Sequence, residues 1–226
     1  MIERYHSDGI GVNEREVLRY LGYGTASMDE GTKILYDECL EILSRTLRCR
    51  ASRCILPARI GVAETKIAEN TFKSASLAAH LAGAEQVILM CATIGPLFDR
   101  ESEKLMHASP ARALIYGAMG TAAVEEWCDR LCGEWEEEFA REGMHLTGRF
   151  SPGYGDLSLS CQPLLLQLTD AGRSAGITLT EGGMMIPKKS VSAIIGIKKE
   201  SSKGRELTGC SACGKKDCDY CEFSKA

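Results

Sequence analysis

The amino-acid sequence predicts an α+β fold in which helices pack on an antiparallel or mixed sheet, followed by a small C-terminal cysteine-rich tail. Patterns typical of helices dominate residues 1–142, and segments typical of strands are scattered among and after them. No regular alternation of strand and helix indicates a doubly wound sheet. The same patterns divide the chain into a domain over residues 1–198, a polar linker over 199–209 and the tail over 210–226.

Two helices are expected near the N-terminus. Asn13 and Glu16 are a helix cap and a capping-box acid, and apolar residues follow at helical spacing until a pair of glycines ends the pattern. Ser27 and Glu30 repeat this start signal. One apolar face then continues for several turns and ends near Arg48, so the second helix is the longer one.

The middle of the chain predicts two strands around a short helix. Residues 53–62 have the composition of a strand that is broken by Pro57. Residues 74–81 have helical spacing and are followed by a glycine. Residues 87–93 form a short, continuous apolar run, which fits a buried strand better than a helix of that length.

A long helix is expected from Pro110 to about Glu142. Its first half is rich in alanine and glycine, which let another backbone approach closely, and its acidic second half predicts a face exposed to water. Turns and strands follow. We expect a turn within 148–155, a helix over 162–171, and strands over 177–181 and 190–198.

Composition and charge are those of an ordinary globular chain. Of the 226 residues, 44% are hydrophobic and 26% are charged, with a net charge of -4. The chain has no basic excess to attract nucleic acid, and no apolar run approaches the roughly 20 residues of a membrane helix. Residues 1–8 are polar and no signal-peptide pattern follows them. We therefore expect a cytoplasmic protein that binds neither nucleic acid nor membrane.

The eleven cysteines form two groups. Their odd number excludes a fully paired disulfide framework. Seven are scattered through apolar surroundings, where we expect them to be buried as small hydrophobic side chains. These seven are Cys39, Cys49, Cys54, Cys91, Cys128, Cys132 and Cys161.

The other four cysteines lie within twelve residues of the tail, as Cys210-x-x-Cys213-x4-Cys218-x-x-Cys221. Two Cys-x-x-Cys pairs can complete a tetrahedral shell of thiolates, which predicts a metal or cluster site. The spacing between the pairs matches neither the usual zinc modules nor the bacterial ferredoxin pattern, so zinc and an iron–sulfur cluster both stay open. The alternative is a flexible tail, reduced or oxidised, that holds no ion.

The segment from Arg149 to Tyr154 (RFSPGY) combines a permanent cation, a proline–glycine turn and an aromatic hydroxyl. Three further motifs follow it in order: Gly176-Ile-Thr-Leu-Thr-Glu181, Met185-Ile-Pro187 and Ser190-Val-Ser192. Together these motifs resemble the activation domain of cobalamin-dependent methionine synthase. The resemblance covers about 50 residues firmly and the preceding long helix more loosely. It implies that residues 1–198 form such a domain.

In that family the Arg-x-x-x-Gly-Tyr loop, here with Gly153 as its glycine, binds S-adenosylmethionine. The resemblance implies that Arg149 holds the ligand's carboxylate and that the backbone around Ser151 contacts the adenosyl group. Tyr154 would line the site on the side of the corrin, in the catalytic position. An acid on the long helix lies near the ligand's amino group in the family, and Glu125 and Glu126 are the candidates here.

The chain also departs from the family pattern. After the Gly-Tyr pair the family has a cysteine–proline segment, and this chain has Gly155-Asp156 followed by alternating leucine and serine. The family's Asp-Trp-Thr-Pro motif has no visible counterpart. The histidine motif that binds cobalamin is also missing from the sequence, so a corrinoid would have to arrive on a partner.

The resemblance implies an S-adenosylmethionine-binding module that supports reductive methylation of cob(II)alamin held by a partner. The partner would be the cobalamin-binding subunit of a methyltransferase, with methionine synthase as the leading candidate. A flavodoxin or ferredoxin would serve as electron donor. Two alternatives remain: a non-enzymatic metal-binding adaptor, and a reactivator of a different corrinoid methyltransferase.

Overall fold

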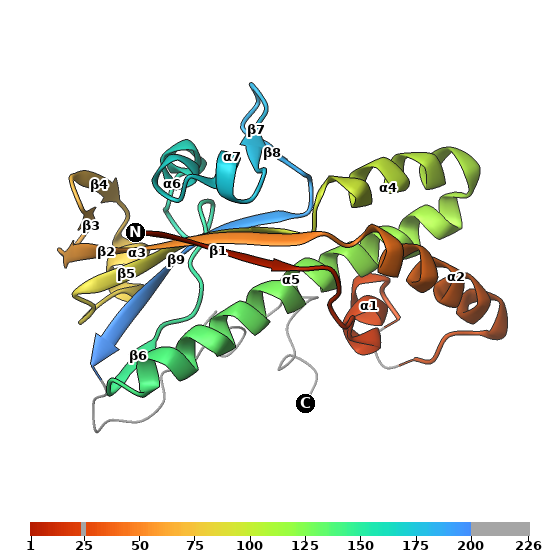
Figure 1. Ribbon diagram of the computed structural model, residues 1–226, viewed down its shortest axis with the longest axis horizontal. Helices are drawn as coiled ribbons and strands as arrows, with labels where there is room; N and C mark the ends of the chain where they lie inside the picture. The colour runs from red at the N-terminus through yellow and green to blue at the C-terminus, as the bar shows by residue number, and fades with distance from the viewer. Residues whose placement is uncertain (24–25, 200–226) are drawn as a thin grey trace.

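The computed structural model describes residues 1–23 and 26–199 and confirms the α+β prediction (Figure 1). A seven-stranded sheet, antiparallel throughout, has the order β4-β3-β2-β5-β9-β6, with β1 also paired to β2. Its strands are β1 (Ile2–Ser7), β2 (Cys49–Ile60), β3 (Glu64–Ile67), β4 (Asn70–Lys73), β5 (Gln86–Thr93), β6 (Met144–Leu146) and β9 (Ser190–Lys199). The strands β7 (Thr178–Leu179) and β8 (Met185–Ile186) form a separate hairpin.

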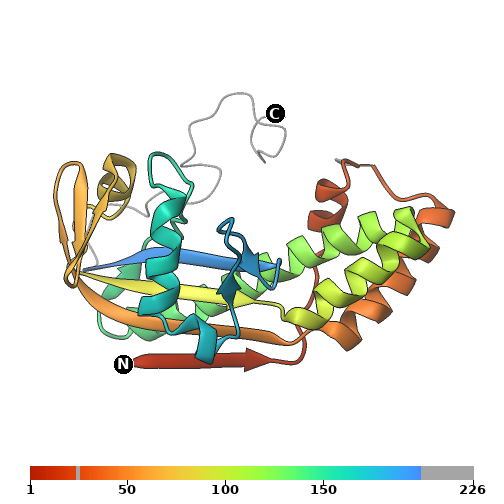
Figure 2. The same ribbon diagram turned by 90° about the horizontal axis from the view of Figure 1, so that it is seen from above.

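Helices cover both faces of the sheet. The long helix crosses one face, and two short helices with the β7–β8 hairpin lie on the other (Figure 1). The remaining helices, except α3, extend beyond the strands at one end of the molecule (Figure 2). The helices are α1 (Glu14–Tyr20), α2 (Glu30–Thr46), α3 (Ala75–His80), α4 (Pro96–Ala108), α5 (Pro110–Ala140), α6 (Gln162–Leu168) and α7 (Ala171–Ser174), with a 3-10 turn at η1 (Leu159–Cys161).

Strand β2 pairs with three other strands. On one side it pairs with β1 up to Cys54 and with β3 from Ala58, and on the other side it pairs with β5. The prediction that Pro57 breaks this strand is wrong. The Ala58 N–H donates to Glu85 O (2.9 Å) toward β5, so the Pro57 nitrogen faces the opposite side, between the ends of β1 and β3. The missing N–H of proline therefore interrupts no ladder.

Consecutive residues of β5 enter different cores, because side chains alternate across a strand. Ile88 and Met90 pack with the helices on the α5 face, and Val87 and Leu89 pack on the α6 face, all of them fully buried. Each such side chain stabilises the fold by about 1.5–3 kcal/mol relative to exposure. The predicted strand over 87–93 is thereby confirmed as the buried centre of the sheet.

The helix starts agree with the sequence in two places and differ in one. Asn13 caps α1 by accepting from Arg15 N, and Ser74 caps α3 by accepting from Leu77 N. The predicted start signal at Ser27 is wrong, because Asp29 is the cap of α2 and accepts from Thr32 N (2.9 Å). An aspartate performs the same task as serine at this position, and it lies two residues further along the chain.

The first half of α5 packs closely against α4, as its small residues predict. A Cβ atom on Gly120 would lie 2.1 Å from Cζ of Phe98, whose ring is stacked on Tyr116 with centroids 4.5 Å apart. We expect Gly120→Ala to lower the free energy of unfolding by about 1–3 kcal/mol through overpacking. Urea unfolding would measure this. Gly133→Ala on the same helix, where a Cβ meets nothing within 4 Å, should be neutral or stabilising, and equal effects would contradict the packing account.

The second half of α5 is tied to the sheet by a buried cation. Arg53 on β2 is only 2% exposed and pairs with Glu3 on β1 and Glu138 on α5, at 2.8 Å each. Its guanidinium lies over the rings of Tyr5 (5.6 Å) and Trp135 (5.2 Å). The acidic run of α5 is thus only partly a water-facing surface, because Glu138 pairs Arg53 and the neighbouring Glu136 accepts from the backbone of β6.

The scattered cysteines follow the prediction in most cases. Five of the seven are buried, Cys132 and Cys161 are half-buried, and all seven are free thiols. Burial raises the pKa of Cys49 and of Cys54 to about 11, so these thiols stay protonated and unreactive at neutral pH.

Across the described residues, no helix combines the length and the apolar character that crossing a membrane requires.

Candidate functional site

The loop of residues 148–156 connects β6 to the 3-10 turn and is held at both ends by α3. At one end, the Asp156 carboxylate accepts from the backbone N–H groups of Ala75 (2.8 Å) and Ser76 (3.1 Å) and from the Ser74 hydroxyl. At the other end, His80 Nε2 lies 2.7 Å from Gly148 O. The short helix therefore fixes the span that contains the Arg-x-x-x-Gly-Tyr motif.

These hydrogen bonds hold the pKa of Asp156 well below its ordinary value of 3.8. The Ser74 hydroxyl makes the largest contribution. Because the folded pKa is depressed, the stabilisation is fully present above about pH 4 and is lost as the pH falls further. We expect Asp156→Asn to unfold at lower urea at pH 7 and to show a flatter dependence of stability on pH between about 4 and 2. A pH profile as steep as that of the wild type would contradict this anchor.

Glycine is required at two positions of the loop. Gly155 has φ +53°, and a Cβ there would lie 2.6 Å from Ser76 Oγ, so a side chain would push α3 away. Gly153 has φ +92°, and its N–H donates to Leu157 O (2.8 Å) to close the turn. The departure from the family pattern at Gly155-Asp156 thus has its own structural role, which is to dock the loop on α3.

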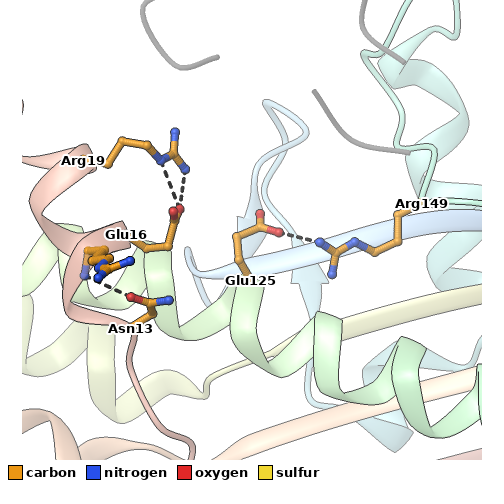
Figure 3. A network of polar contacts seen from close by, with 6 residues as sticks. Asn13, Glu16, Arg19, Glu125 and Arg149 are labelled. Atoms are coloured by element: carbon orange, nitrogen blue, oxygen red, sulfur yellow. Dashed lines mark hydrogen bonds and ion pairs between the residues drawn. The ribbon is translucent and has the colours of Figure 1, made fainter. Parts of the chain in front are cut away.

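Arg149 points from the loop toward α5 (Figure 3). Its Nη2 lies 2.7 Å from Glu125 Oε2 and 2.9 Å from Asp129 Oδ1. The side chain is 20% exposed, and its Nη1 is buried and has no hydrogen-bond partner among the described residues. A buried guanidinium nitrogen without an acceptor costs free energy, so this atom is available to a ligand oxygen.

Burial by itself would lower the pKa of Arg149, but electrostatic interactions with Cys128, Asp129 and Glu125 raise it above its ordinary value. The guanidinium is therefore a permanent cation. Cys128 and Cys132 lie close to it on α5, and burial raises the pKa of Cys132 to about 11. Both thiols are neutral at physiological pH, so the charges at the site are one cation and two carboxylates.

The structure brings Arg149 and Glu125 into contact, whereas Glu126, the other candidate acid, does not contact Arg149. Glu126 is the next residue on α5, and among the described residues it has no hydrogen bond or ion pair. Ser151 is half-buried and its carbonyl accepts from Tyr154 N (3.0 Å). The Tyr154 side chain is 57% exposed, with its ring 6.0 Å from that of Phe150. It is the exposed aromatic group of the loop.

Two residues of the site were missed in the sequence. Asp129 follows Glu125 by four residues, a spacing that places both carboxylates on one helix face, and this signal was present in the sequence. Asp156 was noted only as a departure, because its partners on α3 lie about 80 residues earlier. Local patterns do not contain that contact.

The predicted metal ligands Cys210, Cys213, Cys218 and Cys221 lie outside the described residues. Within residues 1–23 and 26–199, no three His, Cys, Asp or Glu side chains are grouped so that they could hold a metal ion. The metal or cluster site expected at the four tail cysteines therefore stays a prediction.

Comparison with known proteins supports the fold. No protein-family model and no curated protein matches the chain by sequence. Among solved structures, the chain is similar to the crystal structure of the MetH reactivation domain bound to AdoHcy, with a TM-score of 0.65 and 15% sequence identity over 90% of this chain and 80% of that chain. The two proteins share a fold. The similarity at this identity concerns the fold alone.

Proposed function

We propose that this protein binds S-adenosylmethionine at the Arg149 site and acts as a reactivation module for a cobalamin-dependent methyltransferase, with methionine synthase as the leading client. One observation carries the proposal: the buried Arg149 guanidinium faces two carboxylates, and its Nη1 has no hydrogen-bond partner in the part of the chain that the structure describes. The fold of this protein supports the proposal, because it is similar to that of a reactivation domain solved with AdoHcy, the demethylated product of S-adenosylmethionine.

The charges of the site are complementary to those of this ligand. S-adenosylmethionine carries a carboxylate, an ammonium and a sulfonium, and the site carries one cation and two carboxylates. The ligand's carboxylate would pair with Arg149, for which a planar fork of N–H donors is well suited. Glu125 and Asp129 are then free to accept from the ammonium group. Glu125 is favoured over Glu126 as the acid of the site, because of these two glutamates it is Glu125 that contacts Arg149.

The proposed task of the domain is to position a methyl group for transfer. Cobalamin held by the partner would supply the methyl acceptor, after one-electron reduction by a donor of the flavodoxin or ferredoxin class. This protein would supply the methyl group from the sulfonium of its ligand and would retain S-adenosylhomocysteine. The chain's own residues hold the ligand and orient it, which is a contribution of proximity and orientation. Tyr154, which is exposed on the loop, would face the corrin.

Equilibrium dialysis of the full chain with labelled S-adenosylmethionine tests the proposal. We expect one saturable site per chain, with S-adenosylhomocysteine as an effective competitor. Decarboxylated S-adenosylmethionine should compete at least about tenfold less well, because it cannot pair with Arg149. Absence of saturable binding, or equal competition by the decarboxylated compound, would contradict the proposed site.

We also propose that the tail binds a metal ion or cluster through Cys210, Cys213, Cys218 and Cys221. Elemental analysis of the purified chain is expected to give stoichiometric zinc in a colourless protein, or iron with broad visible absorption in a brown one. Replacing the four cysteines with serine should remove the metal. A Cys→Ser variant that retains its metal, or a wild type without one, would contradict the assignment. An iron–sulfur cluster would supply a carrier for the electron.

A further inference from the structure

Helix α1 packs on the core that α5 lines, beside the Arg149 site. Val17 of α1 is fully buried in this core, and Tyr20, one helical turn further along, is half-buried against it. The apolar face of α1 therefore fixes the helix in place, and the position of Tyr20 is set by packing. In Figure 3, α1 lies on one side of Glu125 and Arg149 lies on the other.

The ring of Tyr20 carries a cation of its own helix. Arg19 Cζ lies 4.5 Å from the centroid of this ring, and Arg19 Nη2 lies 2.6 Å from Glu16 Oε2. A guanidinium over an aromatic ring is attracted by the negative face of the ring, so each group helps to fix the other. Helix α1 therefore presents a positioned phenol and an ion pair on its side of Glu125 (Figure 3).

The Tyr20 hydroxyl lies near the acid that contacts Arg149. Burial raises the pKa of Tyr20, and the Arg19 cation partly opposes this effect. The carboxylate of Glu125 raises the pKa further, with a smaller contribution from Glu16. A carboxylate acts on a phenol in this way when the two groups are close in space. The hydroxyl is thus a common neighbour of the Glu16–Arg19 pair and of Glu125.

Glu125 needs a second anchor when a ligand shares Arg149. Without a ligand, Arg149 Nη2 holds Glu125 Oε2 at 2.7 Å, and the Glu125 side chain is 44% exposed. A ligand carboxylate would compete for the same guanidinium. A half-exposed glutamate that loses part of its ion pair also loses its fixed orientation, and ordering it again costs affinity. A neighbouring phenol can preserve that orientation, because its O–H donates to a carboxylate.

We propose that Tyr20 is a positioning residue of the Arg149 site, which orients Glu125 toward the ammonium group of the ligand, and that α1 thereby forms the wall of the site opposite the loop. This inference rests on the proposed function. Tyr20 acts through Glu125, and its hydroxyl, not its ring, performs the task. The effect is therefore confined to ligands that carry the ammonium group.

Tyr20→Phe tests this role with little risk to the fold, because it keeps the ring that packs on the core and carries Arg19. We expect the affinity for S-adenosylhomocysteine to fall about fivefold, the effect of one hydrogen bond. The desamino analogue, which lacks the ammonium group, should bind this variant as well as it binds the wild type. Isothermal titration measures both affinities, and thermal unfolding reports whether the variant folds.

Tyr36→Phe is the matched control. Tyr36 lies on α2, and its ring also carries a cation, Lys33 Nζ, at 4.8 Å from the centroid. The same hydroxyl is removed from a tyrosine that has a similar stacked cation. We expect this variant to bind S-adenosylhomocysteine like the wild type.

A double-mutant cycle separates positioning from a general structural effect. If Tyr20 acts through Glu125, Tyr20→Phe should cause no further loss of affinity in the Glu125→Ala background. Equal losses in both backgrounds, or an equal loss with the desamino analogue, would overturn the positioning role. If the wild type binds S-adenosylhomocysteine and folded Tyr20→Phe binds it equally well, the role is overturned and the proposed function stands. If the wild type binds neither S-adenosylhomocysteine nor S-adenosylmethionine, both are overturned.

Discussion

Replacement of Arg149 by methionine is expected to reduce the affinity for S-adenosylmethionine by about 100-fold, which corresponds to about 2.7 kcal/mol. Methionine retains most of the buried volume but removes the guanidinium that pairs with the ligand's carboxylate. Glu125 and Asp129 would lose their cation, yet their side chains are 44% and 68% exposed and can be hydrated. The loss should therefore appear in binding rather than in folding. Isothermal titration of the wild type and Arg149→Met in parallel would measure the loss of affinity.

Two companion variants sharpen this test. Arg149→Lys keeps the charge but not the planar fork, so its affinity should lie between those of the wild type and Arg149→Met. Arg130→Met is the matched control, because Arg130 lies on the surface of α5 and pairs with the equally exposed Glu134. We expect it to bind like the wild type. Undiminished binding by Arg149→Met, with Arg130→Met unchanged, would remove Arg149 from the site.

The double variant Glu3→Gln/Glu138→Gln is expected to lose about 2–3 kcal/mol of stability. It leaves the buried Arg53 cation without either of its carboxylates, and a buried charge without its partner is strongly destabilising. The expected loss is at the low end of such effects because the two carboxylates are nearly half exposed. Urea unfolding at neutral pH measures the change.

Adding Arg53→Met to the double variant should restore most of this loss, because an apolar side chain of similar length fits between Tyr5 and Trp135 without a charge. Glu137→Gln provides the control, since Glu137 is exposed on the same turn of α5. A triple variant no more stable than the double would show that packing, and not the stranded cation, causes the loss.

Local signals predicted those parts of the fold that depend on neighbouring residues. Asn13, Ser74 and Pro110 each begin a helix where the sequence placed one, and Gln86–Thr93 is the expected buried strand. Helix α4 was missed because its cap is Gly95, which has φ +95° and no side chain to accept a hydrogen bond from the first turn. The usual start signal, a serine, threonine, aspartate or asparagine at the cap, is therefore lacking. Strand β1 was missed because its sequence is largely polar, and its pairing with β2 is a contact between distant segments.

The same distinction holds at the candidate site. Arg149 and Glu125 were identified from the family resemblance, and the structure places them in contact. The residues that position the loop were not identifiable, because Asp156 contacts α3 and His80 contacts Gly148 across about 70–80 residues of chain. Tertiary pairing, which no local pattern encodes, decides these features.

A crystal structure of this protein with S-adenosylhomocysteine tests the central claim most directly, since it locates every group of the ligand. The account predicts that the ligand's carboxylate lies within hydrogen-bond distance of the Arg149 guanidinium and engages Nη1, with the ammonium group near Glu125. A ligand bound elsewhere, with the Arg149–Glu125–Asp129 contacts undisturbed, would contradict it.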